Sequence, residues 1–283
     1  MANLKEQIKS SRPNIKDSTI KMYESNYLNS VIIYLMAINS DKKQDTLLKK
    51  YQDKRDELNQ QYEDEQTSGK ISEKQSKNFV PLKDVVDMIN KMGNDLKGFK
   101  KKELTSKDKM LLQIYIIFQI HVRLPMRNDL AEMESITKRA YNKLNLENKK
   151  AKNYLVVEKG KMFMVLNKFK TSSKYEELRF DVPKDLEKLL RSYLKINGLG
   201  VLFKSSTGKA LSRNQISQLL IKYSKRYIGK SISTTILRKI VLSDKFGELK
   251  KEQEKMASIT GHSVATMNSV YVKEGQDGKD VKS

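Results

Sequence analysis

The sequence predicts a mostly helical α+β protein, with a helical N-terminal domain and a larger catalytic domain that contains a small antiparallel β-sheet. Three observations predict this class. Apolar residues recur at helical spacing along most of the chain, the alternation typical of strands is confined to residues 153–183, and a polar stretch at residues 67–78 interrupts the pattern. A chain of 283 residues with 38% hydrophobic content is long enough for two domains. We place them at residues 1–77 and 78–283, with a linker near 67–78.

The N-terminal domain is expected to contain helices at residues 16–36 and 45–66, and the catalytic domain to open with helices at 81–92 and 107–122. Residues 153–183 then alternate as two or three strands, with turns at 159–161 and 170–174. The last strand is the clearest, because Leu178, Phe180 and Val182 share one face. These strands predict the small antiparallel sheet.

Three amphipathic helices are predicted after the sheet, each ending at a glycine. They cover residues 185–198, 211–229 and 233–247. Ser212 caps the second helix, and Ser233 or Thr234 caps the third. A turn at Gly261 and a cap at Ser263 then predict a short helix near the C-terminus.

The net charge of +22 comes from 56 lysine and arginine residues against 34 acidic ones. This excess favours a polyanionic partner: nucleic acid first, an anionic membrane surface second, with a lysine-rich solvated surface as the third interpretation. The absence of cysteine excludes disulfides, thiolate zinc sites and a cysteine nucleophile, and two histidines are too few for a His-rich metal site. No secretory signal opens the sequence, and its longest apolar run is about half of a membrane span, so we expect a soluble intracellular protein.

Basic residues in the second domain stand where an anionic ligand would satisfy them. Arg238 lies in "TTILRK", inside an amphipathic helix, and an arginine so close to an apolar face needs a partner or an anion. Arg127 follows a very apolar helix in "LPMRNDL". The basic hairpin "NKFKTSSK" offers Lys168, Lys170 and Lys174.

From residue 78 to residue 273, the order of these motifs resembles the tyrosine recombinase (phage-integrase-like) superfamily, which shares its catalytic core with type IB topoisomerases. The matching positions are Arg127, Lys170, Arg238, His262 and Tyr271. His262 follows Gly261, as in the family, and the nine-residue interval from His262 to Tyr271 is a frequent one there.

The resemblance implies that the protein cleaves and rejoins DNA through a covalent 3′-phosphotyrosine, without metal, ATP or another cofactor. Arg127 and Arg238 would hold the nonbridging phosphate oxygens, because a guanidinium is planar and always charged. Tyr271 would attack phosphorus, and a phenol with a pKa near 10 also leaves readily in the return step. Lys170 would protonate the departing 5′-oxygen, and His262 would hydrogen-bond a nonbridging oxygen or assist proton transfer from the tyrosine.

The implied partners are double-stranded DNA and other copies of the chain, since the family works as a homo-tetramer on two duplexes. Lys168, Lys174 and Arg213 are candidate DNA contacts. Neither a membrane nor a small-molecule substrate is implied. Two other functions stay open, namely relaxation of supercoiled DNA, as in type IB topoisomerases, and DNA binding without cleavage.

The sequence departs from the family pattern at two supporting positions. Many members have a histidine three residues before the second arginine, where this chain has Thr235, and here Lys239 follows the arginine. The acid that usually lies three residues after the first arginine is replaced by Asp129, two residues after it. The other histidine, His121, stands in an apolar helix and is expected to be a core or supporting residue.

Two assignments have alternatives. Arg123 competes with Arg127 for the first arginine, since both follow the apolar helix. Lys168 or Lys174 would replace Lys170 if the turn of the hairpin were drawn differently.

Overall fold

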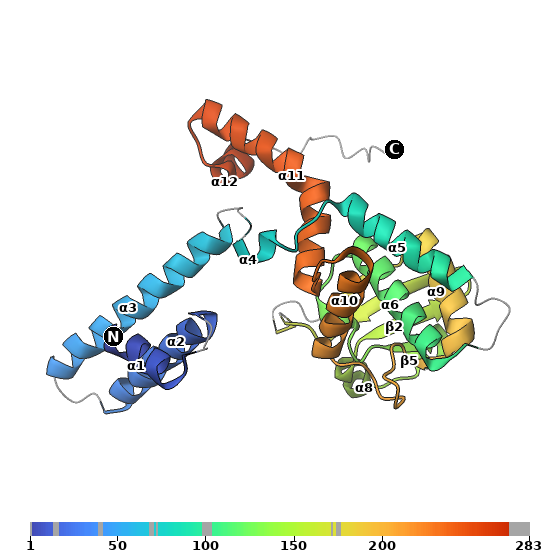
Figure 1. Cartoon of the computed structure of the whole chain (residues 1–283), viewed down its shortest axis with the longest axis horizontal. Coiled ribbons are helices and arrows are strands. Elements are labelled where there is room, and N and C mark those ends of the chain that lie inside the picture. The colour runs from blue at the N-terminus through green and yellow to red at the C-terminus, as the bar shows by residue number, and fades with distance from the viewer. Residues whose placement is uncertain are drawn as a thin grey trace. The chain divides into compact units, whose positions relative to one another are not determined.

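The computed structural model describes residues 2–13, 17–38, 42–67, 71, 73–97, 104–170, 172–173 and 177–271. The chain divides into two compact units, Met1–Ser72 and Glu73–Ser283. Figure 1 colours the first unit in blue tones and the second from cyan-green to red. Helices make up most of the described residues. The strands among these residues form one sheet, which lies in the second unit. The chain is therefore a mostly helical α+β protein, as predicted.

The first unit consists of α1 (Ala2–Ser11), α2 (Asp17–Ile38) and α3 (Lys42–Thr67). α2 packs against both other helices. Its buried side chains recur at helical spacing and form the core of this unit: Ile20, Leu28, Ile32 and Leu35. Both helices predicted from the N-terminal sequence are present.

The second unit places most of its helices around one core. Before and within the sheet they are α4 (Glu73–Ser76), α5 (Leu82–Lys97), α6 (Ser106–Arg123), η2 (Asn128–Leu130), α7 (Lys138–Asn142) and α8 (Leu146–Ala151). After it they are α9 (Lys184–Asn197), α10 (Arg213–Ile228), α11 (Thr234–Thr260), α12 (Val264–Thr266) and the single π-turn η3 (Met267–Tyr271). α6 contacts α5, α9, α10 and α11, so it is the central helix. No helix in the described ranges has the length and apolar character of a bilayer span.

The sheet has five strands: β1 (Glu134–Thr137), β2 (Tyr154–Glu158), β3 (Lys161–Leu166), β4 (Leu178–Asp181) and β5 (Gly200–Val201). Their order is β4-β3-β2-β1-β5, and β1 pairs with β2 in parallel while the other pairs are antiparallel. The two or three strands predicted within residues 153–183 are present as β2, β3 and β4, but the sheet is mixed, whereas an antiparallel sheet was expected. β1 and β5 have four and two residues, too few to show an alternating pattern.

The two faces of the sheet have different covers, because successive residues of a strand point to opposite sides. One face joins the main helical core through Leu155, Met162, Met164 and Leu166. The other forms a smaller cluster with Tyr141 of α7 through Tyr154, Val156, Phe163 and Val165. Burial on both faces fixes the register of β3, the strand that leads to the predicted catalytic lysine.

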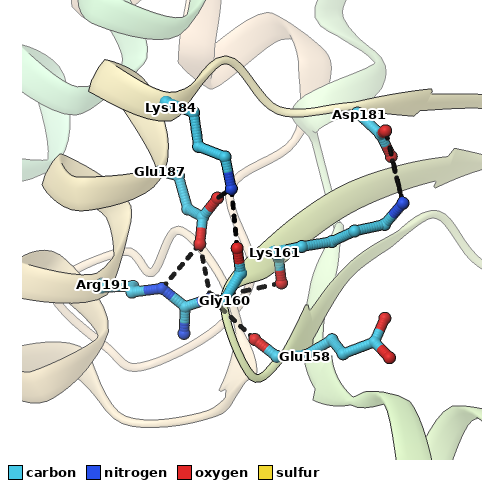
Figure 2. Close-up of polar contacts among 7 residues, drawn as sticks. All are labelled: Glu158, Gly160, Lys161, Asp181, Lys184, Glu187 and Arg191. Atoms are coloured by element: carbon cyan, nitrogen blue, oxygen red, sulfur yellow. Dashed lines mark hydrogen bonds and ion pairs between the residues drawn. The ribbon is translucent and has the colours of Figure 1, made fainter.

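A buried carboxylate joins α9 to the turn between β2 and β3 (Figure 2). Glu187 accepts hydrogen bonds from Arg191 Nε at 2.9 Å and Nη2 at 2.6 Å, and Lys184 Nζ lies 3.4 Å from it. Arg191 Nη2 also donates to the carbonyl oxygen of Glu158 at 2.7 Å, and Lys184 Nζ to that of Gly160 at 2.7 Å. Burial raises the pKa of Glu187, but the bonds from Arg191 and the charge of Lys184 outweigh it and lower the pKa. The network holds the start of β3 on α9.

α11 is one helix of 27 residues, so the predicted helix end at Gly247 is wrong. The residues that follow, "ELKKEQEKM", are mostly strong helix formers, and an internal glycine costs only about 1 kcal/mol relative to alanine. The left-handed glycine that ends the helix is Gly261, with φ 69°. Beyond Val241, Ala257 is the one buried residue of this fully described helix. α11 therefore extends past the body of the unit and carries α12 at its far end (Figure 1).

Candidate functional site

Two arginines that are far apart in the sequence meet where α6 and α11 pack together. Arg127 stands in extended backbone immediately before η2, and Arg238 lies in the second turn of α11. Burial lowers the pKa of Arg238, and the positive charge of Arg127 lowers it further. Neither guanidinium forms a hydrogen bond or an ion pair with another residue that the structure describes. Two neighbouring cations without a bonded counterion favour binding of an anion.

Asp129 supplies the negative charge behind this pair. Its carboxylate is buried, and Oδ1 accepts an ion-paired hydrogen bond from Arg213 Nη2 at 3.1 Å. Burial raises the pKa of Asp129, while the charges of Arg213, Arg127 and Arg238 oppose that rise. The structure thus places Asp129 among three arginines in spite of its offset from the family position. One carboxylate does not neutralise three guanidiniums, so the site keeps a positive charge.

Asn128 holds the segment that carries Arg127 against α10 and α11, a role that the sequence does not reveal. Its amide nitrogen donates to the Arg213 carbonyl oxygen at 2.8 Å and to Ser217 Oγ at 2.9 Å. Its amide oxygen accepts from Thr234 Oγ1 at 2.6 Å. Because Asn128 follows Arg127 directly, these bonds fix the backbone that presents the Arg127 guanidinium.

Asn153 makes a second connection, between the arginine segment and the basic loop after β3. It is buried and uses both ends of its amide. Nδ2 donates to the carbonyl oxygens of Asp129 at 2.9 Å and Lys168 at 3.0 Å, and Oδ1 accepts from the backbone N–H of Asn167 at 2.9 Å and Lys168 at 2.8 Å. A buried amide with all of its hydrogen bonds made fixes the positions of its partners, because breaking any of these bonds leaves a buried polar group without a hydrogen bond. No spacing in the sequence marks this residue.

The predicted basic hairpin lies at this side of the site. Lys168 and Lys170 are both exposed, and Phe169 between them is buried in the core. Arg213 Nη2 donates to the Lys168 carbonyl oxygen at 3.2 Å, which connects the loop to the Asp129 ion pair. Lys174 lies outside the described residues. Lys168 and Lys170 are therefore accessible to a polyanion, and the burial of Phe169 between them fixes their backbone.

Three other candidates occupy distinct surroundings. Thr235 is exposed and lies three residues before Arg238, so both project from one side of α11. Lys239 Nζ donates to Gln75 Oε1 of α4 at 2.8 Å and so binds within the protein. Arg123 pairs with Asp185 and hydrogen-bonds Gln119, unlike Arg127.

His121 lies deep behind the arginines, at the last turn of α6. Its ring is fully buried, Nδ1 lies 2.9 Å from the Ile117 carbonyl oxygen, and Nε2 has no hydrogen-bond partner in the part of the chain that the structure describes. Burial lowers the pKa of His121 to about 4, against the opposing effect of the Ile117 carbonyl, and the charge of Arg238 contributes to the decrease. The neutral ring supports the core beside Arg238, as its apolar helix predicts.

His262 and Tyr271 form a pair at the far end of α11. Their rings stack with centroids 4.9 Å apart and planes inclined by 25°, and both residues are exposed. Gly261 supplies the turn, and Ser263 caps α12 by accepting a hydrogen bond from the Thr266 N–H at 3.0 Å. Arg238 and Thr260 are 22 positions apart on α11, which is about 33 Å of helix at 1.5 Å per residue, and the helix bends along its length (Figure 1). The structure brings Arg127, Asp129, Arg213 and Arg238 together, and it keeps His262 and Tyr271 apart from them.

The described residues contain no group of three or more His, Cys, Asp or Glu side chains arranged to hold a metal ion. Asp129 instead bonds to Arg213. The chemistry of the site as described is that of guanidinium and ammonium groups.

Comparison with known proteins gives a distant structural likeness. The chain is similar to a solved structure entitled "Crystal structure of XerA recombinase", with 15% sequence identity and a TM-score of 0.33. The alignment covers 62% of this chain and 60% of that one. No family model and no curated protein matches the sequence.

Proposed function

We propose that this protein is a site-specific DNA recombinase that cleaves and rejoins DNA through a covalent 3′-phosphotyrosine. The observation that carries the proposal is the pair Arg127 and Arg238, whose guanidiniums bond to no other described residue and are backed by the buried carboxylate of Asp129. Lys168 and Lys170 are exposed on the loop that Arg213 connects to Asp129, and the whole chain has a net charge of +22. A phosphodiester within DNA is the anion that suits such a site.

In this proposal the guanidiniums stabilise the charge that develops on the phosphate. Attack on phosphorus forms a pentacoordinate transition state with more negative charge on its nonbridging oxygens. Arg127 and Arg238 donate charge-assisted hydrogen bonds to those oxygens, and Asn128 and Asp129 hold the donors in place before DNA arrives. Loss of one such donor costs about 10²–10³-fold in rate.

The proposed bond changes balance without an external energy source. The Tyr271 phenol oxygen forms a bond to phosphorus, and its proton passes to His262 or to water. The bond from phosphorus to the 5′-oxygen breaks, and Lys170 donates the proton that the departing oxygen needs. Rejoining reverses these steps, with the 5′-hydroxyl attacking and the phenol leaving.

A nicked duplex that loses the 5′-side fragment after cleavage tests the proposal, because religation is then impossible. The wild-type chain should accumulate a covalent protein–DNA adduct that survives denaturation. Tyr271→Phe should form none while binding the same duplex with unchanged affinity. An equal amount of adduct with Tyr271→Phe would show that the mechanism is wrong.

A second candidate is DNA binding without cleavage, which the distance between Tyr271 and Arg238 along α11 favours. Binding that weakens steeply with salt, together with no adduct on any substrate, would support it. Relaxation of supercoiled plasmid by the isolated chain, without recombination between two sites, would instead support an activity like that of type IB topoisomerases.

A further inference from the structure

We infer that Glu132 is a base-reading residue: its carboxylate accepts a hydrogen bond from the amino group of a cytosine close to the phosphate held by Arg127 and Arg238. The inference rests on the proposed function and deepens it, because it names a residue that selects the DNA sequence. The starting observation is the backbone of Glu132, which has φ 58°. In the part of the chain that the structure describes, every other residue with a positive φ is a glycine.

Backbone hydrogen bonds on both sides impose the left-handed conformation of Glu132. The Glu132 N–H donates to the Leu211 carbonyl oxygen at 3.2 Å, and the Met133 N–H donates to that of Leu130 at 3.3 Å. A residue with a Cβ is uncommon in this conformation, which glycine adopts without a steric cost. Residues held in such a conformation occur most often at functional sites. The strained backbone therefore calls for a use of the glutamate side chain.

The side chain of Glu132 has no hydrogen bond or ion pair that would explain the strain. It is exposed, and its carboxylate bonds to no other residue in the described ranges. The next carboxylate along the chain, that of Glu134, instead pairs with Lys152. Glu132 is thus an acceptor that is fixed in position and free for a ligand.

Glu132 lines a hollow of about 230 Å³ that adjoins the arginine site. Arg213, on the rim of the hollow, donates from Nη2 to Asp129 Oδ1 at 3.1 Å and to the Lys168 carbonyl oxygen at 3.2 Å. The hollow is therefore next to the carboxylate that backs the two phosphate-binding arginines. The rest of its lining is formed by Ala131, Ala151, Lys152, Asn153, Lys168 and Arg213.

The charges around the hollow determine which part of a nucleotide each side chain meets. Lys168 and Arg213 attract the phosphates of the backbone. Glu132 repels phosphate, and an ionised carboxylate only accepts hydrogen bonds, so it requires a donor. The donors that a base edge offers are its amino groups. A DNA strand held by the two cations would accordingly turn a base edge, and not a phosphate, toward Glu132.

Among the bases, cytosine suits a carboxylate best in the major groove. Its N4 amino group donates, and Glu or Asp is the usual acceptor for it. Adenine also has an amino group, but the N7 acceptor beside it repels the second carboxylate oxygen. Glu132 should therefore favour cytosine at one position of the bound duplex.

Selection from a pool of duplexes with a randomised central segment tests this preference through binding, independently of cleavage. The wild-type chain should enrich cytosine at one position, and another base there should weaken binding about 5- to 150-fold, the range for one mismatched base pair. Glu132→Gln should prefer adenine at that position, because a glutamine amide pairs with N6 and N7 of adenine. An unchanged cytosine preference in Glu132→Gln would overturn the inference.

Glu134→Gln is the matched control, since Glu134 lies in the same segment and its carboxylate is already paired with Lys152. This variant should keep the cytosine preference. Loss of the preference in both variants would mean that the negative charge of the segment acts in general, and it would overturn the role of Glu132.

Glu132→Gly tests the reason for the strained backbone. The variant should resist urea at least as well as the wild type, because glycine adopts a positive φ freely, and it should lose the cytosine preference. A lower urea midpoint would show that Glu132 stabilises the fold and would overturn the inference. Binding without any base preference, by a chain that still forms the tyrosine adduct, overturns the inference alone, whereas a wild-type chain that binds no duplex overturns the proposed function as well.

Discussion

The imidazole of His262 stacks on the phenol of Tyr271, with ring centroids 4.9 Å apart. The stack places Tyr271, the proposed nucleophile, beside an imidazole that is able to take its proton. Thr235 occupies the place where many tyrosine recombinases have another histidine, and a hydroxyl is no base near neutral pH. His121 is buried with its pKa lowered to about 4 and lies in the core. In the proposed mechanism, His262 is therefore the one imidazole that remains to take the tyrosine proton.

Replacing His262 is the first test of that dependence. His262→Ala should lower the rate of adduct formation by roughly 10²–10⁴-fold, the usual contribution of a positioned acid or base. DNA affinity should stay the same, because the arginines and lysines proposed to bind the phosphates are left in place. Single-turnover cleavage and a binding isotherm on the same duplex separate the two effects. A loss of less than threefold in rate would remove His262 from the mechanism.

The arginine pair has a matched control in the same segment. Arg127→Ala should reduce adduct formation about 10²–10³-fold, because one charge-assisted donor to the phosphate is lost. Arg123→Ala should leave cleavage per folded molecule nearly unchanged, since Arg123 pairs with Asp185. Similar losses for both variants would mean that the first arginine has been misassigned.

The buried histidine predicts how stability depends on pH. The pKa of His121 falls from 6.5 to about 4 on folding, so the folded state keeps the ring neutral where the unfolded chain binds a proton. Its contribution is complete above pH 6.5 and is lost as pH falls toward 4, at a cost of about 3 kcal/mol in the free energy of unfolding. Urea denaturation of the wild type should show this loss, and His121→Phe should lack most of it. Parallel pH profiles for the two proteins would contradict it.

Two glycines distinguish a continuous α11 from one that breaks in the middle. Gly247 has no neighbouring atom within 4 Å of an added Cβ and has helical surroundings, so Gly247→Ala should raise the free energy of unfolding by about 0.5–1 kcal/mol. Gly261 has φ 69°, so Gly261→Ala should lower the free energy of unfolding. Destabilisation by Gly247→Ala would indicate that the helix ends at residue 247.

Local signals in the sequence were sufficient for much of the fold. Ser212 caps α10 by accepting a hydrogen bond from the Gln215 N–H, and the helix ends at Gly229 with φ 68°, as the residue types predict. The strands on either side of Gly160 are long and apolar enough to identify. The parallel pairing of β1 with β2 was not predictable, because tertiary contacts rather than a periodic pattern form so short a strand.

The candidate site was less visible in the sequence than the fold. Its arginines stand in recognisable motifs, but Asn128 and Asn153 act through bonds to residues that are distant in the sequence. The end of α11 was missed because glycine is both a common helix terminator and a tolerated interior residue. Whether the helix ends at Gly247 or at Gly261 determines where Tyr271 lies relative to Arg238.

The most direct test of the central claim identifies the atom that joins protein to DNA. The adduct formed on the nicked duplex would be digested with protease and nuclease, and the nucleotide-bearing peptide sequenced by mass spectrometry. We predict a phosphodiester between the phenol oxygen of Tyr271 and the 3′ end of the cleaved strand. A nucleotide attached to any other residue, or linkage through the 5′ end, would contradict the proposed function.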